Sequence, residues 1–560
     1  MVMDAELGVR QACAKVPFRS LQQAAPLAQG QFQRTSRRGA HPQGVRASAT
    51  ACPQPAHHRT RRAVDAMRYF VERQTRLPQS QLAPPTVFEQ IGAVVQNFNR
   101  RNIIIMRKVT FLVLLLLMVP NPTRCQVTNK HDVAQGEYYV AYQPDLQTYP
   151  NYSFEIGDLD GDGRMELVSL DQTGNRLRAI TLEGREVFEK RLNNNALWGT
   201  ALIAVTDLNG DERAEVAVPA STDRIKLFNG KGQQMAEYVT GSSAKDHFGM
   251  GIPLLAPFRC SNKPGLIAAV AGGRIVALDG NLKELWRKEG FRHDFGHEFF
   301  VADIDGDGFD EVAFITVDNI NKGLGPDNHG DLVILDHDGR VILRERVDRY
   351  WPDSHFDSIG LADFRGIGKT EVLLEKGILI NLHGDVVWDA SKNFEHGQWI
   401  AHFADPSGKG QRIVISELWG KGRKNVILNG VNGKVLATIT NPARTELDQA
   451  TFPHWVVRPT RCHVVRWTPD AAREIFLGEQ AVRSQGPPGP SYDLKSSFVD
   501  IDGRLLGVLP FRDRQVEGYF YNAEVHSFVA DVDGDGRQEV VFPRQDGHVM
   551  VIKKREKGKK

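Results

Sequence analysis

The sequence lacks the features that mark several large classes of protein. Five cysteines in 560 residues are too few for a disulfide-stapled scaffold. No run approaches the ~20 consecutive apolar residues that a membrane-spanning helix needs, which excludes a polytopic membrane protein. The formal net charge is only +2, so a protein that grips nucleic acid along its length is not expected. Hydrophobic residues make up 41% and charged residues 25% of the chain, as in ordinary globular proteins, and a chain disordered throughout is excluded.

The small net charge hides two segments of opposite charge. Residues 1–105 contain 14 Arg, one Lys and five acidic residues, whereas residues 126–560 contain 52 basic and 63 acidic residues. The first segment is rich in Arg, Gln, Ala and Pro without a sustained apolar period, which is typical of disorder. One interpretation is a basic arm for an anionic partner. We favour the other, that 1–105 is disordered or an artefact of the assigned gene start.

Residues 106–125 have the layout of a secretory signal peptide. A short positive segment, 106–108, precedes the unbroken apolar run 111–119, and prolines follow it. A signal peptide operates at an N-terminus, so we expect translation to start at Met106. The mature chain would be 126–560, secreted or periplasmic, and without a transmembrane anchor.

Cysteine usage leaves two questions open. Cys125 at the predicted cleavage site would suit a lipoprotein, but Arg124 before it fits a lipobox poorly, so we favour simple secretion. Cys260 and Cys462 are the cysteines of the mature chain. They either pair in an oxidising compartment or stay as buried thiols.

One unit recurs from about residue 150 onward: an apolar strand, an acidic loop and further short strands separated by Asp-Gly-type turns. The four acidic loops are DLDGDGRME (158–166), DLNGDERAE (207–215), DIDGDGFDE (303–311) and DVDGDGRQE (531–539). Degenerate copies that have lost most oxygen side chains lie at 256–268, 363–371, 405–413 and 468–475. The spacing of about 42 to 65 residues is typical of four-stranded propeller blades. We therefore predict an all-β fold with a single β-propeller of eight blades over 126–560, or seven if one degenerate copy is only a long loop.

The two ends of the repeat array complement each other. The last unit stops after its third strand, 548–553, and a lone strand, 137–142, precedes the first unit. That strand can supply the missing fourth strand and remove an exposed sheet edge. We expect the ring to close through this pairing.

The acidic loops carry oxygen ligands at offsets 0, 2, 4 and 8, with a main-chain carbonyl at offset 6. Hard oxygen ligands in this number favour Ca²⁺ over Zn²⁺ or copper. An EF-hand does not fit, because it needs flanking helices and a glutamate at loop position 12. We predict about four structural Ca²⁺ ions, the alternative being plain acidic turns without metal. The predicted ligands are Asp158, Asp160, Asp162, the Arg164 carbonyl and Glu166; Asp207, Asn209, Asp211, the Arg213 carbonyl and Glu215; Asp303, Asp305, Asp307, the Phe309 carbonyl and Glu311; and Asp531, Asp533, Asp535, the Arg537 carbonyl and Glu539.

Several histidines lie shortly before the first strand of a unit, in the segment that joins one blade to the next. This segment meets the innermost strand at the end opposite the acidic loop. We therefore expect the histidines to ring one mouth of the central channel, and the acidic loops to lie on the other face. The alternative for each is a structural hydrogen bond. The residues are His247, His297, His355, His396, His454 and His526.

The loops resemble the FG-GAP/VCBS repeats of calcium-binding β-propellers, and HFGMGIPL (247–254) is similar to part of the FG-GAP sequence. A narrower resemblance is to the family 11 rhamnogalacturonan lyases, which are secreted, eight-bladed and calcium-rich. The phrases EHGQWIAHFADPSGKG and FGHEFFVADIDGDGFDEV look like the histidine-strand-loop phrases of that family. The resemblance implies β-elimination on a uronate-containing glycan.

Such a lyase needs a cation to neutralise the uronate carboxylate, a base to remove the C5 proton and an acid to assist the departing oxygen. A second, catalytic metal held by histidines stays open. The candidate catalytic residues are His297, His355, His396, His454, Arg292 and, as the acid, Tyr350. The candidate substrate-binding residues are Trp351, Trp399 and Trp455, which could stack on sugars or equally fill the core, and Arg349 and Arg458.

A second hypothesis comes from a different class of protein. FG-GAP propellers are often binding modules, so the chain could bind carbohydrate or a protein partner on the same surface without catalysis. Nucleophilic hydrolysis is disfavoured, because the sequence has no GxSxG or His-Glu-x-x-His motif.

Overall fold

The computed structural model describes residues 137–147, 150–171, 175–192, 203–246, 250–296, 299–317, 330–350, 358–419, 424–439, 445–447, 455–482, 491–514 and 527–555. All of them belong to one compact unit of the chain. The predicted disordered segment 1–105 and the predicted signal peptide 106–125 lie outside the described residues. Secondary structure in the described part consists of 35 strands and two short 3₁₀ helices, η4 (Val347–Arg349) and η5 (Ser391–Asn393).

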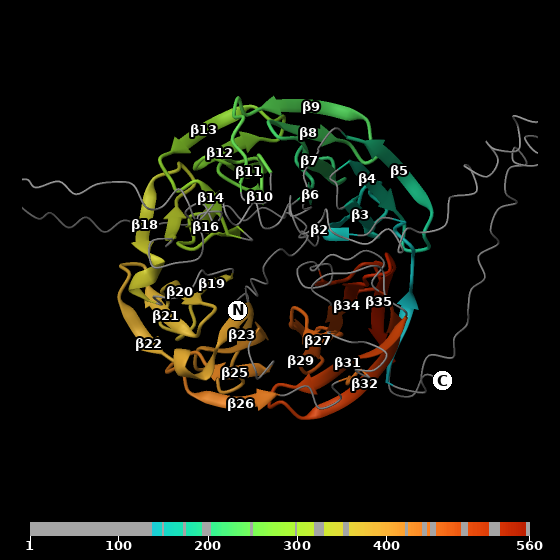
Figure 1. Cartoon of the computed structure of the whole chain (residues 1–560), viewed down its shortest axis with the longest axis vertical. Helices are drawn as coiled ribbons and strands as arrows, with labels where there is room; N and C mark the ends of the chain where they lie inside the picture. Colours follow the sequence, from blue (N-terminus) through green and yellow to red (C-terminus); the bar gives the residue numbers. More distant parts are fainter. Residues whose placement is uncertain are drawn as a thin grey trace, which may run out of the picture. The chain divides into compact units, whose positions relative to one another are not determined.

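Eight antiparallel sheets follow one another around a ring, and we number them blades 1 to 8 in chain order (Figure 1). Blades 1 to 4 consist of β2 (Pro150–Gly157), β3 (Glu166–Asp171), β4 (Arg176–Ile180) and β5 (Glu186–Arg191); β6 (Ala204–Thr206), β7 (Glu215–Ser221), β8 (Arg224–Phe228) and β9 (Gln234–Val239); β10 (Leu254–Phe258), β11 (Gly265–Val270), β12 (Arg274–Asp279) and β13 (Glu284–Glu289); and β14 (Asp294–Phe295), β15 (Phe300–Ala302), β16 (Glu311–Val317), β17 (Asp331–Leu335) and β18 (Val341–Arg346).

Blades 5 to 8 complete the ring. They consist of β19 (Ile359–Ala362), β20 (Glu371–Leu374), β21 (Ile378–Asn381) and β22 (Val386–Asp389); β23 (His396–Ala404), β24 (Gln411–Trp419), β25 (Asn425–Asn429) and β26 (Val435–Ile439); β28 (His463–Val465), β29 (Glu474–Leu477), β31 (Tyr492–Asp500) and β32 (Leu505–Asp513); and β33 (Phe528–Ala530), β34 (Glu539–Pro543), β35 (Val549–Lys554) and β1 (Tyr138–Tyr142). A separate two-stranded sheet, β27 (Val456–Pro459) with β30 (Glu479–Val482), extends blade 7.

The predicted number of blades is confirmed. Each of the eight loops found in the sequence, acidic or degenerate, connects the innermost strand of one blade to its second strand. The alternative of seven blades is excluded, because every degenerate copy starts a sheet of its own.

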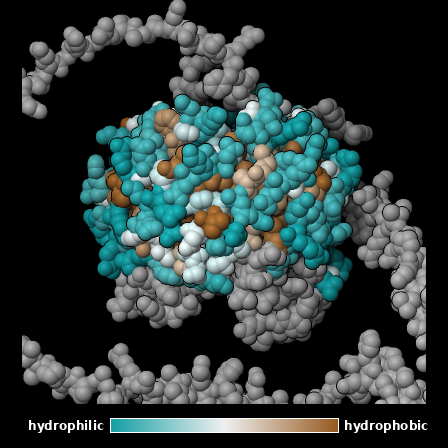
Figure 2. Space-filling model, turned by 90° about the horizontal axis from the view of Figure 1, so that it is seen from above, coloured by the Kyte–Doolittle hydropathy of each residue, from teal (hydrophilic) through white to brown (hydrophobic). Residues whose placement is uncertain are grey.

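Burial explains why the inner and outer strands differ in sequence. The second strand β16 reads EVAFITV and is buried at all seven positions, since neighbouring blades cover both of its faces. The outermost strand β13 reads ELWRKE and alternates between exposed and half-buried residues, because one of its faces meets water. The side of the molecule seen in Figure 2 is accordingly mostly hydrophilic, with hydrophobic residues scattered singly or in small groups.

The predicted ring closure is also confirmed. Strand β1 pairs antiparallel with β35, with Tyr138 opposite Lys554 and Val140 opposite Ile552. Figure 1 shows β1 at the rim beside β35, so residues from both ends of the described chain share blade 8. The Tyr138 ring stacks on Phe498 of blade 7 with centroids 3.8 Å apart, and this stacking ties the closing strand to the neighbouring blade.

Two further expectations concern cysteine and the membrane. Cys260 and Cys462 are both free thiols, and burial raises the pKa of each to about 11. Within the described residues, no helix combines the length and the apolar character required to cross a bilayer.

Candidate functional site

The acidic loops occupy the same place in four blades. They connect β2 to β3, β6 to β7, β15 to β16 and β33 to β34. Adjacent loops are joined by main-chain hydrogen bonds: Met165 N donates to Val532 O at 2.8 Å, and Ala214 N donates to Asp158 O at 2.7 Å. Loops that follow the innermost strand therefore lie side by side along one face of the ring, which we call the loop face.

Within each loop, the first aspartate and the last glutamate organise the main chain. Asp158 accepts hydrogen bonds from Gly161 N at 2.7 Å and Gly163 N at 2.8 Å, and Glu166 accepts one from Leu159 N at 2.9 Å. The equivalent acceptor–donor pairs in the other loops are Asp207 with Gly210, Glu215 with Leu208, Asp303 with Gly306, Glu311 with Ile304, Asp531 with Gly536 and Glu539 with Val532.

The turn in the middle of each loop requires a left-handed backbone conformation. Gly163, Gly308 and Gly536 have φ of +88°, +94° and +82°, which glycine adopts at no steric cost. In the second loop the same place is taken by Glu212 with φ +66°. A side chain at this position adds strain, so the second loop is the least favourable of the four.

The structure brings predicted ligands together in three of the four loops. The clusters are Asp158, Asp160 and Glu166; Asp303, Asp305 and Glu311; and Asp531, Asp533 and Asp535. In each cluster the carboxylate oxygens lie within 4.8 Å of one another. Glu311 Oε1 and Asp531 Oδ1 are buried without a hydrogen-bond partner. Buried acceptors without a donor are costly, and a cation held among them would remove that cost.

The electrostatics of the loops points the same way. Burial, with further repulsion from the loop aspartates, raises the pKa of Glu166, Glu215 and Glu311 to about 7. Burial also raises the pKa of Glu539 to about 7, although Lys553 opposes the shift. Burial is thus the main cost of keeping these glutamates ionised, and repulsion from the loop aspartates adds to it.

In two of the loops, a nitrogen-bearing side chain already contacts the carboxylates. In the second loop, Asn209 Nδ2 donates to Glu215 Oε1 at 2.9 Å. In the fourth loop, the Lys553 ammonium of β35 lies 2.7 Å from Asp533, 2.6 Å from Asp535 and 3.3 Å from Glu539. A metal ion fits the first and third loops best, because in the described part no lysine ammonium and no side-chain amide donates to their carboxylates.

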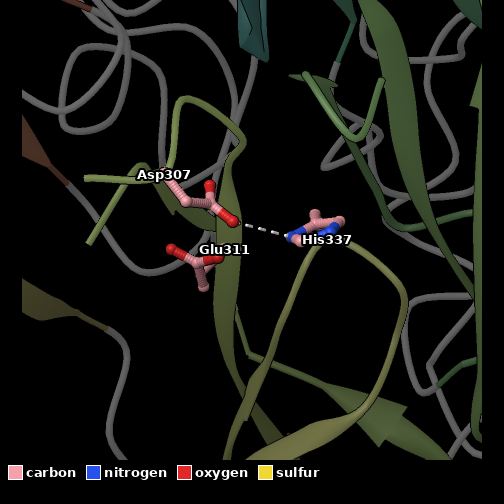
Figure 3. Close-up of side chains that lie close together, drawn as sticks. All are labelled: Asp307, Glu311 and His337. Carbon is pink, nitrogen blue, oxygen red and sulfur yellow. Dashed lines mark ion pairs between the residues drawn. The ribbon is translucent and has the colours of Figure 1, made fainter. Parts of the chain in front are cut away.

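The third loop also faces a histidine that the sequence patterns did not indicate. His337 lies in the hairpin between β17 and β18, and its Nδ1 is 3.5 Å from Asp307 Oδ2 (Figure 3). Asp307, Glu311 and His337 together form a further potential metal-binding group. Only an alignment of the seven hairpins between third and fourth strands could have singled it out, since His337 lies 26 residues beyond the loop.

Most of the histidines expected at the channel mouth fall outside the described residues. This holds for His247, His297, His355, His454 and His526, and for Trp351. Of His396 only the backbone is described, at the first position of β23. Strand β23 is nine residues long and ends directly before the degenerate loop at 405–410, so His396 and that loop are separated by about 26 Å along the strand. His396 therefore lies at the end of its blade opposite the loop face.

The remaining candidate residues make contacts within the fold. Arg292 Nε donates to Asp331 Oδ1 at 3.1 Å. The Tyr350 hydroxyl donates to Gly384 O at 2.9 Å, and burial raises the pKa of Tyr350 to about 12. Arg349 is partly exposed and pairs with Glu345 at 2.9 Å. The hydroxyl proton of Tyr350 is therefore already used in a hydrogen bond to the main chain.

Of the three candidate tryptophans, the two that are described are core residues. Trp399 and Trp455 are 1% and 4% exposed, which matches the alternative of a packing role. The Arg461 guanidinium lies 4.3 Å from the centre of the Trp399 ring. Trp455 packs on Tyr492 with centroids 5.3 Å apart. Arg458 is buried in β27.

Comparisons with known proteins agree with the repeat pattern. Residues 152–218 match the family described as FG-GAP-like repeat. The chain is 29% identical over 356 residues to the rhamnogalacturonan endolyase YesW of Bacillus subtilis (strain 168), covering 49% of this chain and 52% of that protein. It is 22% identical over 467 residues to the rhamnogalacturonan exolyase YesX of the same organism, covering 76% of this chain and 66% of that protein.

The crystal structure of the exotype rhamnogalacturonan lyase YesX is similar with a TM-score of 0.49 and 18% identity, covering 74% of this chain and 72% of that one. The chain spans about half to two thirds of the length of the curated relatives it matches. The predicted resemblance to FG-GAP propellers and to rhamnogalacturonan lyases is confirmed at this level.

Proposed function

We propose that this chain is a propeller polysaccharide lyase that cleaves a uronate-containing glycan by β-elimination. The observation that carries the proposal is the sequence similarity to two rhamnogalacturonan lyases. The similarity to one of these lyases extends over 76% of the chain. The eight-bladed ring supports it, because the segments between blades lead into the innermost strands of the ring.

The proposed reaction site lies at the end of the blades opposite the loop face. His297, His355, His396 and His454 all belong to segments that lead into an innermost strand. A neutral imidazole at this mouth would remove the C5 proton, since its ordinary pKa lies near 6.5. Arg292, oriented by Asp331, is one described cation on such a segment. We assign the acid to none of the described residues, because the Tyr350 hydroxyl already donates to Gly384.

We further propose that Ca²⁺ binds the acidic loops as a structural ion, most tightly at the first loop. The ion would supply the positive charge that the buried glutamates and neighbouring aspartates lack. Because adjacent loops are joined by main-chain hydrogen bonds, an ion that fixes one loop also fixes the neighbouring blade. We also propose that residues 106–125 act as a signal peptide, which would export the chain to a compartment where calcium is plentiful.

The test of the lyase proposal is direct. The chain is incubated with rhamnogalacturonan and other uronate polymers, and ultraviolet absorbance of the unsaturated product is followed. We expect product with at least one polymer. Alanine at the catalytic histidine among His297, His355, His396 and His454 should lower kcat by about 10²- to 10⁴-fold. His383→Ala, in an exposed hairpin of the loop face, is the matched control and should leave kcat unchanged.

Two results would contradict the proposal. The absence of product on every polymer, with glycan binding retained, would favour the non-catalytic binding propeller. Unchanged turnover in all four histidine variants would remove the proposed site while leaving the activity in place.

A further inference from the structure

The third acidic loop differs from the other three in the side chains that surround it. Asp307 and Glu311 come from the connection between β15 and β16, and His337 comes from the hairpin between β17 and β18. One ligand atom of each residue lies within 4.8 Å of the others. Figure 3 shows the Asp307 carboxylate and the His337 imidazole facing one another, with Glu311 beside them.

The spacing of these atoms suits a shared ion better than a direct contact. His337 Nδ1 and Asp307 Oδ2 are 3.5 Å apart, beyond the usual 2.7–3.2 Å of a hydrogen bond from nitrogen to oxygen. Two ligand atoms on one tetrahedral ion at bond lengths of ~2.0–2.1 Å are separated by about 3.4 Å. The observed distance is close to that separation.

Two atoms of the cluster are buried without a hydrogen-bond partner among the described residues: His337 Nδ1 and Glu311 Oε1. The Glu311 side chain is 1% exposed, and its other oxygen accepts from Ile304 N at 2.8 Å. A buried carboxylate oxygen and a buried imidazole nitrogen that face the same space point to a bound cation, which would satisfy both.

The hairpin holds His337 in place. Asp336 Oδ1 accepts hydrogen bonds from Asp338 N at 3.0 Å and Arg340 N at 2.7 Å, and Trp286 Nε1 of blade 3 donates to His337 O at 2.8 Å. His337 Nε2 is 3.7 Å from Asp338 Oδ2. With the proton on Nε2, the Nδ1 lone pair is available to a metal ion.

The imidazole is specific to blade 4. His337 is the second residue of the turn between the third and fourth strands of blade 4. In the other six hairpins of this kind, the second residue of the turn is glycine or aliphatic. These residues are Leu182, Gly230, Gly280, Leu382, Gly430 and Ile501. Packing against the neighbouring blade therefore does not require a histidine here.

We propose that Asp307, Glu311 and His337 form a mixed nitrogen–oxygen site that binds a divalent transition-metal ion of the Zn²⁺ type. Imidazole nitrogen favours such ions, whereas Ca²⁺ prefers oxygen ligands alone. Three protein ligands leave one coordination position of a tetrahedral ion open. The proposal rests on the metal-binding role proposed for the acidic loops, and it gives the third loop a different ion preference from the first.

The test uses the full, untagged chain after chelator treatment and dialysis. Co²⁺, whose visible absorption reports nitrogen–oxygen coordination, is titrated into the chain and then displaced with Zn²⁺. We expect His337→Gln and Asp307→Asn to weaken Co²⁺ binding about tenfold or more. His383→Gln is the matched control: it removes an exposed histidine from the equivalent hairpin of blade 5 and should bind Co²⁺ like the unmodified chain.

A parallel Ca²⁺ titration by calorimetry separates this proposal from the proposed role of the loops. Co²⁺ binding that depends on His337 but not on His383 supports the site, whether or not the other loops bind Ca²⁺. If His337→Gln binds Co²⁺ as tightly as the unmodified chain, or if His383→Gln weakens it equally, the site is overturned even where Ca²⁺ binding is intact. Equal melting temperatures of the variants exclude a folding defect as the cause.

Discussion

At the scale of single residues, the fourth acidic loop is distinguished by a cation built into the chain. The Lys553 side chain is 9% exposed, and its ammonium contacts Asp533, Asp535 and Glu539. An ammonium among three carboxylates does part of what a divalent ion would do, without the geometry of a coordination shell. The fourth loop should therefore depend on calcium less than the first.

This dependence gives a prediction for Lys553→Met. Removing the ammonium leaves buried carboxylates without a counter-charge, so we expect the free energy of unfolding in chelator to fall by about 3 kcal/mol. Saturating Ca²⁺ should recover much of that loss, because the emptied loop can then accept the ion. Denaturant unfolding with and without chelator measures both effects. Lys231→Met, at an exposed hairpin lysine, should change stability by less than about 0.5 kcal/mol; an equally small change for Lys553→Met would contradict the prediction.

The same residues show what sequence patterns can and cannot predict. Asp158 and Glu166 could be assigned as candidate ligands because both belong to one nine-residue loop, whose spacing alone brings their oxygens together. Lys553 and His337 reach their loops from a neighbouring strand and from a hairpin. Their roles depend on strand register, which the sequence does not reveal residue by residue.

At the scale of elements, strand register explains why a lysine stands in blade 8. The last glutamate of each acidic loop begins the second strand of its blade. In the other blades, the residue opposite this position lies at the end of the third strand, where the chain turns toward the fourth strand. In those blades it is usually Asp or Asn, such as Asn381 opposite Glu371 and Asp500 opposite Glu474. In blade 8 the chain does not turn, because β1 supplies the fourth strand. The register then leaves Lys553 opposite the glutamate position and free of any turn-forming role.

The closing strand β1 gives a second prediction. Tyr138 stacks on Phe498, and its hydroxyl donates to Glu474 Oε2 at 2.8 Å. Tyr138→Ala should lower the free energy of unfolding by about 3–5 kcal/mol, as for other buried aromatic rings. Tyr138→Phe should cost only about 1 kcal/mol, because Trp467 Nε1 still donates to the same oxygen at 2.7 Å.

Hydrogen exchange locates the effect of these variants. Loss of the Tyr138 ring should speed exchange of the β35 amides first, since they pair with β1. Tyr139→Ala, at the half-buried next position of the same strand, is the control and should have the smaller effect. Equal losses for Tyr138→Ala and Tyr139→Ala would show that blade 8 is not held by the contact with Phe498.

At the scale of the whole molecule, the blade count could be predicted because every blade repeats one local arrangement of strand, loop and strand. The sequence did not indicate where individual blades depart from that arrangement. In blade 4 two short strands, β14 and β15, share the place of one innermost strand, and in blade 7 the pair β27 and β30 forms an extra sheet. The break between β14 and β15 interrupts an innermost strand, and β27 precedes one. At both places a few irregular residues change which strands pair, without changing the hydrophobic pattern of the sequence.

The ring as a whole is expected to lose stability when calcium is removed. Residues 126–560 carry 63 acidic and 52 basic residues, and the loop face concentrates carboxylates whose buried glutamates have raised pKa values. Chelation should lower Tm in one cooperative transition, because each blade packs against two neighbours and the ring has no free end. High NaCl should recover part of the loss by screening the repulsion between exposed loop aspartates. Calorimetry with and without chelator, at low and high NaCl, measures these changes. An unchanged Tm would contradict a structural role for calcium, and separate transitions for individual blades would contradict the cooperativity of the closed ring.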